Sequence, residues 1–220
     1  MARPLTIKQI QQALNLLDFD VEAAQRKMAP AARKMTRPQQ LDGNPRYGGV
    51  LLLLFRKEKS IHILLTKRRH DLTSHAGQIS FPGGRKEPLE SLLETALRET
   101  EEEIGIPAVD LEVLGALTPI YIPPSDYEVH PYVAWFRQGR QPVFEAAPCE
   151  VAEIIEAPLA TLLDPASRIE ENWDFGGIQR VVPFFAVQKY KVWGATAVML
   201  SEFIERLRLV LVSNSSQLPL

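Results

Sequence analysis

The chain has one cysteine, no strong excess of either charge and no long hydrophobic run, and each absence excludes a class of protein. The single thiol, Cys149, excludes an intramolecular disulfide framework and a cysteine-based metal cluster. A formal net charge of −2 gives no electrostatic reason to expect a nucleic acid partner. The longest uninterrupted apolar run, residues 50–55, is far shorter than the roughly 20 residues that span a bilayer. We therefore expect an ordinary globular protein that is not integral to a membrane, and a local basic patch remains compatible with this composition.

The N-terminal stretch combines two short helical patterns with a polar segment. Thr6 is positioned to cap a helix over residues 7–17, and a second helical pattern covers residues 21–28. The stretch has no signal-type apolar core, and its three acidic residues are ones that transit peptides avoid, so we expect a cytoplasmic location. Residues 30–47 are rich in proline and basic residues, and they fit either a plain linker or an arm that packs on a partner subunit.

From Gly48 onward the pattern is that of a mixed sheet with few helices. Two apolar runs separated by "KEKS" predict a buried hairpin, and a helix is predicted over residues 88–104, with Pro88 at its first position. Further strands are predicted at residues 111–117, 129–136, 152–156, 181–187 and 190–193, before a closing helix over residues 195–211. This order favours an α/β fold with a mixed sheet flanked by helices, and not a regular βαβ alternation.

The segment "RETEEEIGI", residues 98–106, places four glutamates at the end of a helix, where the helix dipole disfavours negative charge. At about 100° per residue, Glu99, Glu102 and Glu103 converge beside the buried stripe, and Glu101 points to solvent. Three carboxylates at this spacing repel one another, but together they would suit a hard divalent cation such as Mg²⁺. A solvated acidic face is the ordinary alternative.

A glycine pair precedes this helix. Gly83 and Gly84, in "FPGGRKEP", let backbone N–H groups approach an anion closely. A Gly-Gly turn alone is a weak signal, but here it stands next to the three glutamates. The combination is typical of a site for a metal-bound phosphate.

The stretch Gly84–Ile106, "GRKEPLESLLETALRETEEEIGI", is similar to the Nudix box, G-x5-E-x7-R-E-U-x-E-E-x-G-U, where U is a bulky apolar residue. Thr100 is the one departure, and we expect it to affect packing only. The fixed positions of the box are matched by Gly84, Glu90, Arg98, Glu99, Glu102, Glu103, Gly105 and Ile106.

The resemblance implies a Nudix α/β/α sandwich and hydrolysis of a diphosphate with Mg²⁺ or Mn²⁺ as the cofactor. It implies that Glu99, Glu102 and Glu103 bind the metal and that Arg98 orients them. The general base is open among Glu102, Glu150 and Glu153. The expected organisation is an N-terminal helical arm and linker over residues 1–46, a Nudix hydrolase domain over 47–212 and a tail over 213–220. A homodimer is a default expectation for the family.

The stretch before the box, "LLTKRRHDLTSHAGQISFPGG", resembles the additional signature of the coenzyme A pyrophosphatase branch, L-L-T-x-R-[S/A]-x3-R-x3-G-x3-F-P-G-G. Arg69 replaces the small residue of the signature, and Thr73 replaces its second arginine. The residues that the resemblance offers for substrate binding are Arg68, Arg69, His75, Gly83 and Gly84, with a loop-holding hydrogen bond as the alternative for His75.

These patterns predict a divalent-metal pyrophosphohydrolase that cleaves coenzyme A or its derivatives to 3′,5′-ADP and 4′-phosphopantetheine. Two rival hypotheses remain. A Nudix hydrolase for ADP-ribose or a dinucleotide would keep the box and depart from the upstream signature, as Arg69 and Thr73 do. A non-catalytic Nudix-like nucleotide-binding module would usually have lost some of the glutamates, and all three are present.

Overall fold

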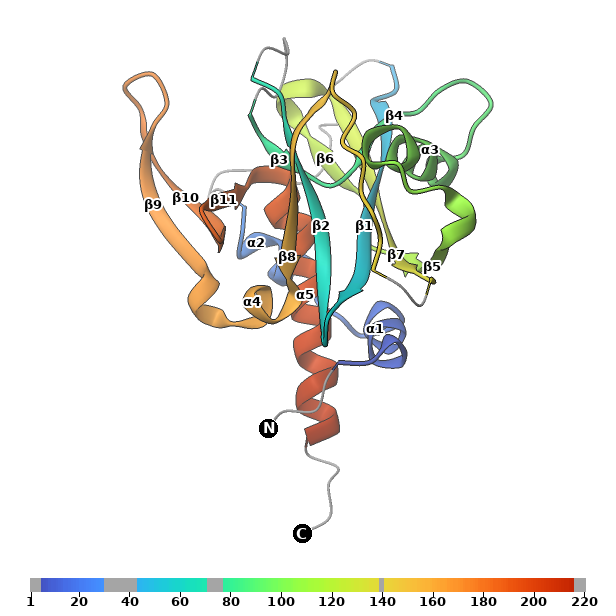
Figure 1. The fold of residues 1–220 in the computed structure, drawn as a ribbon. Coiled ribbons are helices and arrows are strands. Elements are labelled where there is room, and N and C mark those ends of the chain that lie inside the picture. Colours follow the sequence, from blue (N-terminus) through green and yellow to red (C-terminus); the bar gives the residue numbers. More distant parts are fainter. Residues whose placement is uncertain (1–4, 30–42, 71–76, 139–140, 216–220) are drawn as a thin grey trace.

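The computed structural model describes residues 5–29, 43–70, 77–138 and 141–215 (Figure 1). The helices are α1 Ile7–Leu14, α2 Val21–Arg26, α3 Leu92–Ile104, α4 Leu159–Leu163 and α5 Gly194–Ser215. The strands are β1 Arg46–Lys57, β2 Ser60–Arg68, β3 Ile79–Ser80, β4 Gly83–Arg85, β5 Leu111–Ala116, β6 Ile120–Ile122, β7 Tyr127–Phe136, β8 Val151–Pro158, β9 Arg168–Asp174, β10 Gln179–Val187 and β11 Tyr190–Trp193.

A large mixed sheet forms the centre of the molecule, with strand order β3-β2-β1-β7-β5. β1 pairs in parallel with β7 and antiparallel with β2 and β4. Strand β8 pairs with β2, and β6 pairs with β7. A separate ribbon of β11, β10 and β9 extends from the side of the molecule (Figure 1). The architecture is the α/β/α sandwich with a mixed sheet that the sequence predicts.

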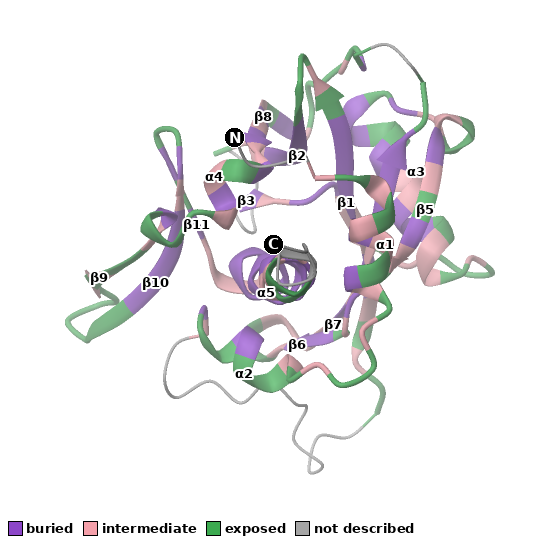
Figure 2. Cartoon of the chain, turned by 90° about the horizontal axis from the view of Figure 1, so that it is seen from below, coloured by how far each residue is buried: buried purple, intermediate pink, exposed green. Residues whose placement is uncertain are grey.

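Both faces of the sheet are covered, which explains the apolar run in β1. Leu51, Leu53 and Phe55 belong to the core cluster that also contains Ala96 of α3. Leu52 and its strand neighbours on the other face belong to the larger cluster, which contains buried residues of α1 and α5. Because side chains of a strand alternate between faces, a strand buried on both faces is continuously apolar. Viewed end-on, α5 lies centrally among the other elements (Figure 2).

Helix α3 is fixed at both ends by local signals. Ser91 is its N-cap and forms a reciprocal capping box with Glu94. Gly105 ends the helix in the left-handed conformation with φ 74°, which costs glycine little. The prediction that Pro88 occupies the first helical position is wrong, because the helix begins at Leu92, and Leu89 before it has φ 72°.

The remaining strand predictions agree with the structure to within a few residues, but the sequence does not predict the short strands β3, β4 and β6 or the edge strand β9. The β9 sequence "RIEENWD" is mostly charged and polar, because this strand pairs only with β10 at the edge of the ribbon. The closing helix continues to Ser215, so it includes the first residues of the segment expected to be a tail.

The two N-terminal helices pack on the same chain. Ile10 and Ala13 of α1 and Met28 after α2 are fully buried in the core cluster that contains α5. The linker or arm predicted over residues 30–47 lies mostly outside the described residues, so that alternative stays open. Among the helices that the structure describes, none is long and apolar enough to cross a membrane.

Candidate active site

Arg98 joins three carboxylates at the start and on the face of α3. Its Nε and Nη2 donate to the two Glu90 carboxylate oxygens at 3.1 and 3.0 Å. Its Nη1 donates to Glu99 at 2.9 Å and to Glu102 at 3.0 Å. The paired geometry to Glu90 is the strong, bidentate form of an arginine–carboxylate interaction. Arg98 therefore holds Glu99 and Glu102 to one guanidinium nitrogen, an arrangement compatible with the orienting role that the resemblance implies.

Glu90 has a partner that sequence reasoning did not assign. Hydrogen bonds from Arg98, and then from the Glu87 backbone and the Thr95 hydroxyl, lower the pKa of Glu90 to about 2. The match of Glu90 to a fixed position of the Nudix box indicates that this residue matters, but the spacing does not show which side chain it contacts. The ion pair with Glu90 also raises the pKa of the Arg98 guanidinium.

Glu103 is the buried member of the three glutamates. Its residue is 3% exposed, and burial raises the pKa of its carboxyl to about 8, although the nearby Arg68 charge opposes this. Its Oε2 is buried and has no hydrogen-bond partner among the described residues. The helical wheel placed Glu103 at the edge of the buried stripe, whereas tertiary packing encloses it. A buried carboxyl with an unpaired oxygen is a costly feature that a ligand would relieve.

Glu99 lies directly over the glycine pair. A Cβ added to Gly84 would come within 2.3 Å of the Glu99 carboxylate, so only glycine leaves room for this approach. Burial raises the pKa of Glu99, although Arg98 opposes the shift. Glu102 is more exposed than Glu99 and Glu103, with 58% of its side chain accessible. Glu101 is also exposed, as predicted.

The residues present fit a hard divalent cation in their chemistry. All three donors are carboxylates, two of them have pKa values raised by burial, and one buried oxygen lacks a partner. Within the described parts of the chain, no three acidic, histidine or cysteine side chains are arranged as a preformed metal site.

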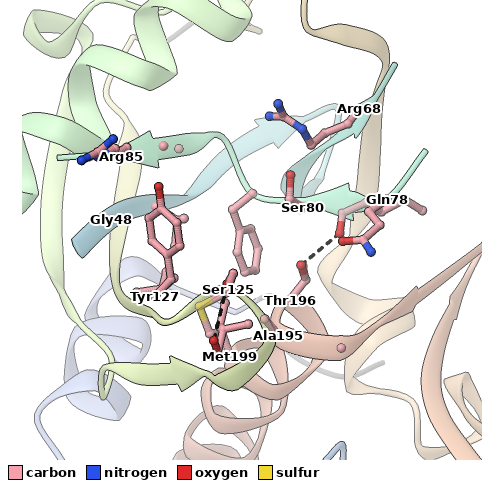
Figure 3. A pocket seen from close by; sticks show the side chains of 18 of the residues that line it. Gly48, Arg68, Gln78, Ser80, Arg85, Ser125, Tyr127, Ala195, Thr196 and Met199 are labelled. Atoms are coloured by element: carbon pink, nitrogen blue, oxygen red, sulfur yellow. Dashed lines mark hydrogen bonds between the residues drawn. The ribbon is translucent and has the colours of Figure 1, made fainter. Parts of the chain in front are cut away.

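Arg68 lies on the other side of Glu103. Its Nη1 is 3.8 Å from Glu103 Oε1 and 3.8 Å from Glu150 Oε2. It also lines a cavity of about 610 Å³ that reaches Gly83 and Gly84 (Figure 3). Its neighbour Arg69 instead donates from Nη1 to the Pro148 carbonyl at 2.7 Å. The structure thus brings Arg68 and the glycine pair together with the glutamates.

The two glutamates outside the box have different surroundings. The negative charge of Glu150 acts on both Glu99 and Glu103. Glu153 instead interacts with Tyr190 and with Lys189, whose Nζ lies 3.3 Å from its carboxylate, and these contacts lower its pKa. His75 and Thr73 lie outside the described residues.

Known proteins resemble the chain over most of its length. The family model described as the NUDIX domain matches residues 45–175. An uncharacterized Nudix hydrolase NudL from Photorhabdus laumondii is 37% identical over 172 residues, covering 78% of this chain and 90% of that protein. A protein of the same name from Yersinia enterocolitica is 33% identical over 175 residues, covering 79% and 87%. A crystal structure of a MutT protein from Methanosarcina mazei has 18% identity and a TM-score of 0.49, covering 81% of this chain and 100% of that one.

Proposed function

The chain belongs to the Nudix family of hydrolases, and we propose that it cleaves the diphosphate of coenzyme A or its derivatives with Mg²⁺ or Mn²⁺ as the cofactor. The products would be 3′,5′-ADP and 4′-phosphopantetheine. Hydrolysis and a requirement for a divalent metal are properties of the family. The substrate, the choice of metal and the roles of individual residues are the content of the proposal.

Arg68 is the residue that supports this substrate most directly. It matches the arginine of the coenzyme A signature, and its guanidinium lies between Glu103 and Glu150. It also lines the cavity that reaches the glycine pair. An arginine in this position can bind a phosphate of the substrate diphosphate through paired hydrogen bonds.

In the proposed mechanism, Glu99, Glu102 and Glu103 would hold the metal. Arg98 would keep the carboxylates of Glu99 and Glu102 in position. A bound divalent cation neutralises the diphosphate and makes a bound water more acidic. Glu102 and Glu150 are the better candidates for the group that accepts a proton from water, because Lys189 and Tyr190 already engage Glu153. Gly83 and Gly84 line the cavity beside these glutamates, where the phosphates of the substrate would lie.

The proposal is tested by incubating the purified protein with Mg²⁺ or Mn²⁺ and a panel of coenzyme A, ADP-ribose and diadenosine polyphosphates, with products identified by mass. Coenzyme A should turn over fastest. Glu102→Gln should lower kcat by about 10²-fold or more, because it removes a metal ligand or a base. Glu101→Gln is the matched control and should retain activity, since Glu101 is exposed on the same helix.

Each other result has a defined meaning. Faster turnover of ADP-ribose than of coenzyme A would overturn the substrate and favour the rival hydrolase. No turnover of any compound with either metal would favour a nucleotide-binding module. Full activity of Glu102→Gln would exclude Glu102 as an essential ligand or base.

A further inference from the structure

The cavity beside the glycine pair lies along one face of β1, where Gly48 and Val50 line it (Figure 3). Apolar side chains, among them Val50, Phe81 and Met199, line much of it. Its volume of about 610 Å³ is within the usual range for small-molecule sites. Two further arginines, Arg46 and Arg85, belong to its lining, and no part of the proposed mechanism uses them.

Within residues 5–29, 43–70, 77–138 and 141–215, Arg46 is held in place without an acidic partner. Its Cζ lies 4.6 Å from the centroid of the Tyr127 ring, and its Nη2 donates to the Ser125 carbonyl. Among the described residues, no carboxylate forms an ion pair with Arg46 or Arg85, whereas Arg98 and Arg206 both have such partners. An aromatic ring and a carbonyl orient the Arg46 guanidinium, and no carboxylate in the described part of the chain compensates its positive charge.

The strand register places Arg46, Arg85 and Tyr127 next to one another on strands β1, β4 and β7. Arg85 is opposite Gly48 in the antiparallel β1–β4 pair, and Tyr127 is opposite Arg46 in the parallel β1–β7 pair. Arg46 and Gly48 are two residues apart on β1, so they share a face. The Tyr127 ring packs beside Gly48, where an added Cβ would lie 3.7 Å from the ring and 2.8 Å from the Gly84 carbonyl oxygen. Figure 3 shows the Tyr127 hydroxyl pointing toward β4.

The Tyr127 hydroxyl adds a neutral donor to the two cations. No hydrogen bond of this hydroxyl is found among the described residues, and Tyr127 is half-buried at the cavity wall. Two uncompensated guanidinium groups and a hydroxyl on one face match the charge and the acceptor oxygens of a phosphate monoester. The diphosphate itself is placed elsewhere by the proposed function, at Gly84 and the glutamates.

We propose that Arg46, Arg85 and Tyr127 bind a second phosphate of the substrate, separate from the diphosphate that is cleaved. This inference rests on the proposed function, in which that group is the 3′-phosphate of coenzyme A. The cluster then selects nucleotides that carry an additional phosphate monoester over those, such as ADP-ribose, that do not.

The first test compares coenzyme A with 3′-dephospho-coenzyme A, which differs only in this phosphate. The wild-type protein should have the higher kcat/KM for coenzyme A. Arg46→Gln should lower kcat/KM for coenzyme A by about tenfold or more, because a charge-assisted hydrogen bond is lost. It should change the value for the dephospho compound by less than about twofold, as expected of a surface substitution. Arg56→Gln, an exposed arginine at the far end of β1, is the matched control and should change neither value.

A binding experiment separates this inference from the proposed function. By calorimetry, 3′,5′-ADP should bind the wild-type protein more tightly than AMP, and Arg46→Gln should remove most of that difference. Equal binding of the two nucleotides, or an equal loss for both in the variant, would overturn the phosphate site. If neither coenzyme A compound is cleaved, the proposed function fails, and the nucleotide comparison still decides the inference.

Discussion

Arg98 positions the acidic side chains through four hydrogen bonds to carboxylates. Glu90 is its bidentate partner and accepts two of them. Glu90 precedes the helix and lies eight residues from Arg98, so no helical spacing connects the two. The loop before α3 turns the Glu90 carboxylate back over the first turn, where the Thr95 hydroxyl also donates to it. This arrangement links the loop to the helix that carries the glutamates.

The Glu90 pKa predicts a pH-dependent contribution to stability. The folded value of about 2 lies below the ordinary value of 4.5, so Glu90 stabilises the fold fully above about pH 4.5 and loses this contribution as the pH falls toward 2. Glu90→Gln should therefore lower the free energy of unfolding at pH 7 by about 1–3 kcal/mol. The difference from wild type should shrink between pH 4.5 and 2. Urea unfolding at a series of pH values measures both effects.

Glu87→Gln serves as the control for this series, because Glu87 is an exposed carboxylate in the same loop. It should differ little from wild type at every pH. A Glu90→Gln deficit of constant size from pH 7 to pH 2 would contradict the assigned role of ionised Glu90.

The sequence predicts which glutamates share one face of α3, but it does not predict the burial of Glu103 or the pKa shifts that follow from burial. The spacing of Glu99, Glu102 and Glu103 identifies one helix face, since helical geometry is local. The burial of Glu103 depends on Arg68 and Gly83, which reach it from β2 and β4. No periodicity within α3 contains that information.

At the scale of elements, the site depends on how closely β4 approaches α3. Gly84 is where the two meet, because any Cβ there would contact the Glu99 carboxylate. The helix itself could be predicted, since its capping signals lie within the sequence of α3 and its flanks. Strands β4 and β6 are three residues long, which is too short to show a hydrophobic period, so they could not be predicted from the sequence.

Gly84→Ala should reduce activity without unfolding the protein. The nearest atoms to the added methyl belong to the end of the flexible Glu99 side chain, which can move, so the stability cost should be about 1 kcal/mol or less. Displacing Glu99 should lower kcat by about tenfold or more, since small misplacements in a catalytic site are costly. Steady-state kinetics and a thermal melt measure the two effects.

Gly105→Ala is the complementary variant. Gly105 has a φ of 74°, so alanine there should cost about 1 kcal/mol of stability, with a smaller effect on kcat. If Gly84→Ala kept full activity, the close approach of β4 to Glu99 would have no functional importance.

At the scale of the whole molecule, a buried polar network joins the N-terminal helices to the rest of the fold. Glu202 of α5 is fully buried. It accepts hydrogen bonds from Gln25 of α2 and from Thr118 in the loop before β6. Arg206 completes the network, with its Nε 3.0 Å from the Glu202 carboxylate and its guanidinium over the Phe19 ring. Four separate parts of the chain meet at this point.

The sequence did not predict this junction, because its members are far apart along the chain and each has an ordinary local pattern. Glu202 and Arg206 look like a surface pair at i and i+4 of an exposed helix. Tertiary contacts bury them, from residues 5–29 on one side and from the loop before β6 on the other. The N-terminal stretch, which the sequence suggested as an arm, thus contributes to the main core.

Arg206→Leu should therefore destabilise the protein by about 3–5 kcal/mol, because it leaves the Glu202 carboxylate buried without its cation. Arg26→Leu breaks an i, i+4 ion pair with Glu22 that is exposed on both sides, and it should cost less than about 1 kcal/mol. Urea unfolding of both variants provides the comparison. A loss for Arg206→Leu no larger than that for Arg26→Leu would contradict a stabilising role for the buried Glu202–Arg206 pair. A loss several times larger would establish the buried network as the connection between these helices and the sandwich that carries the site.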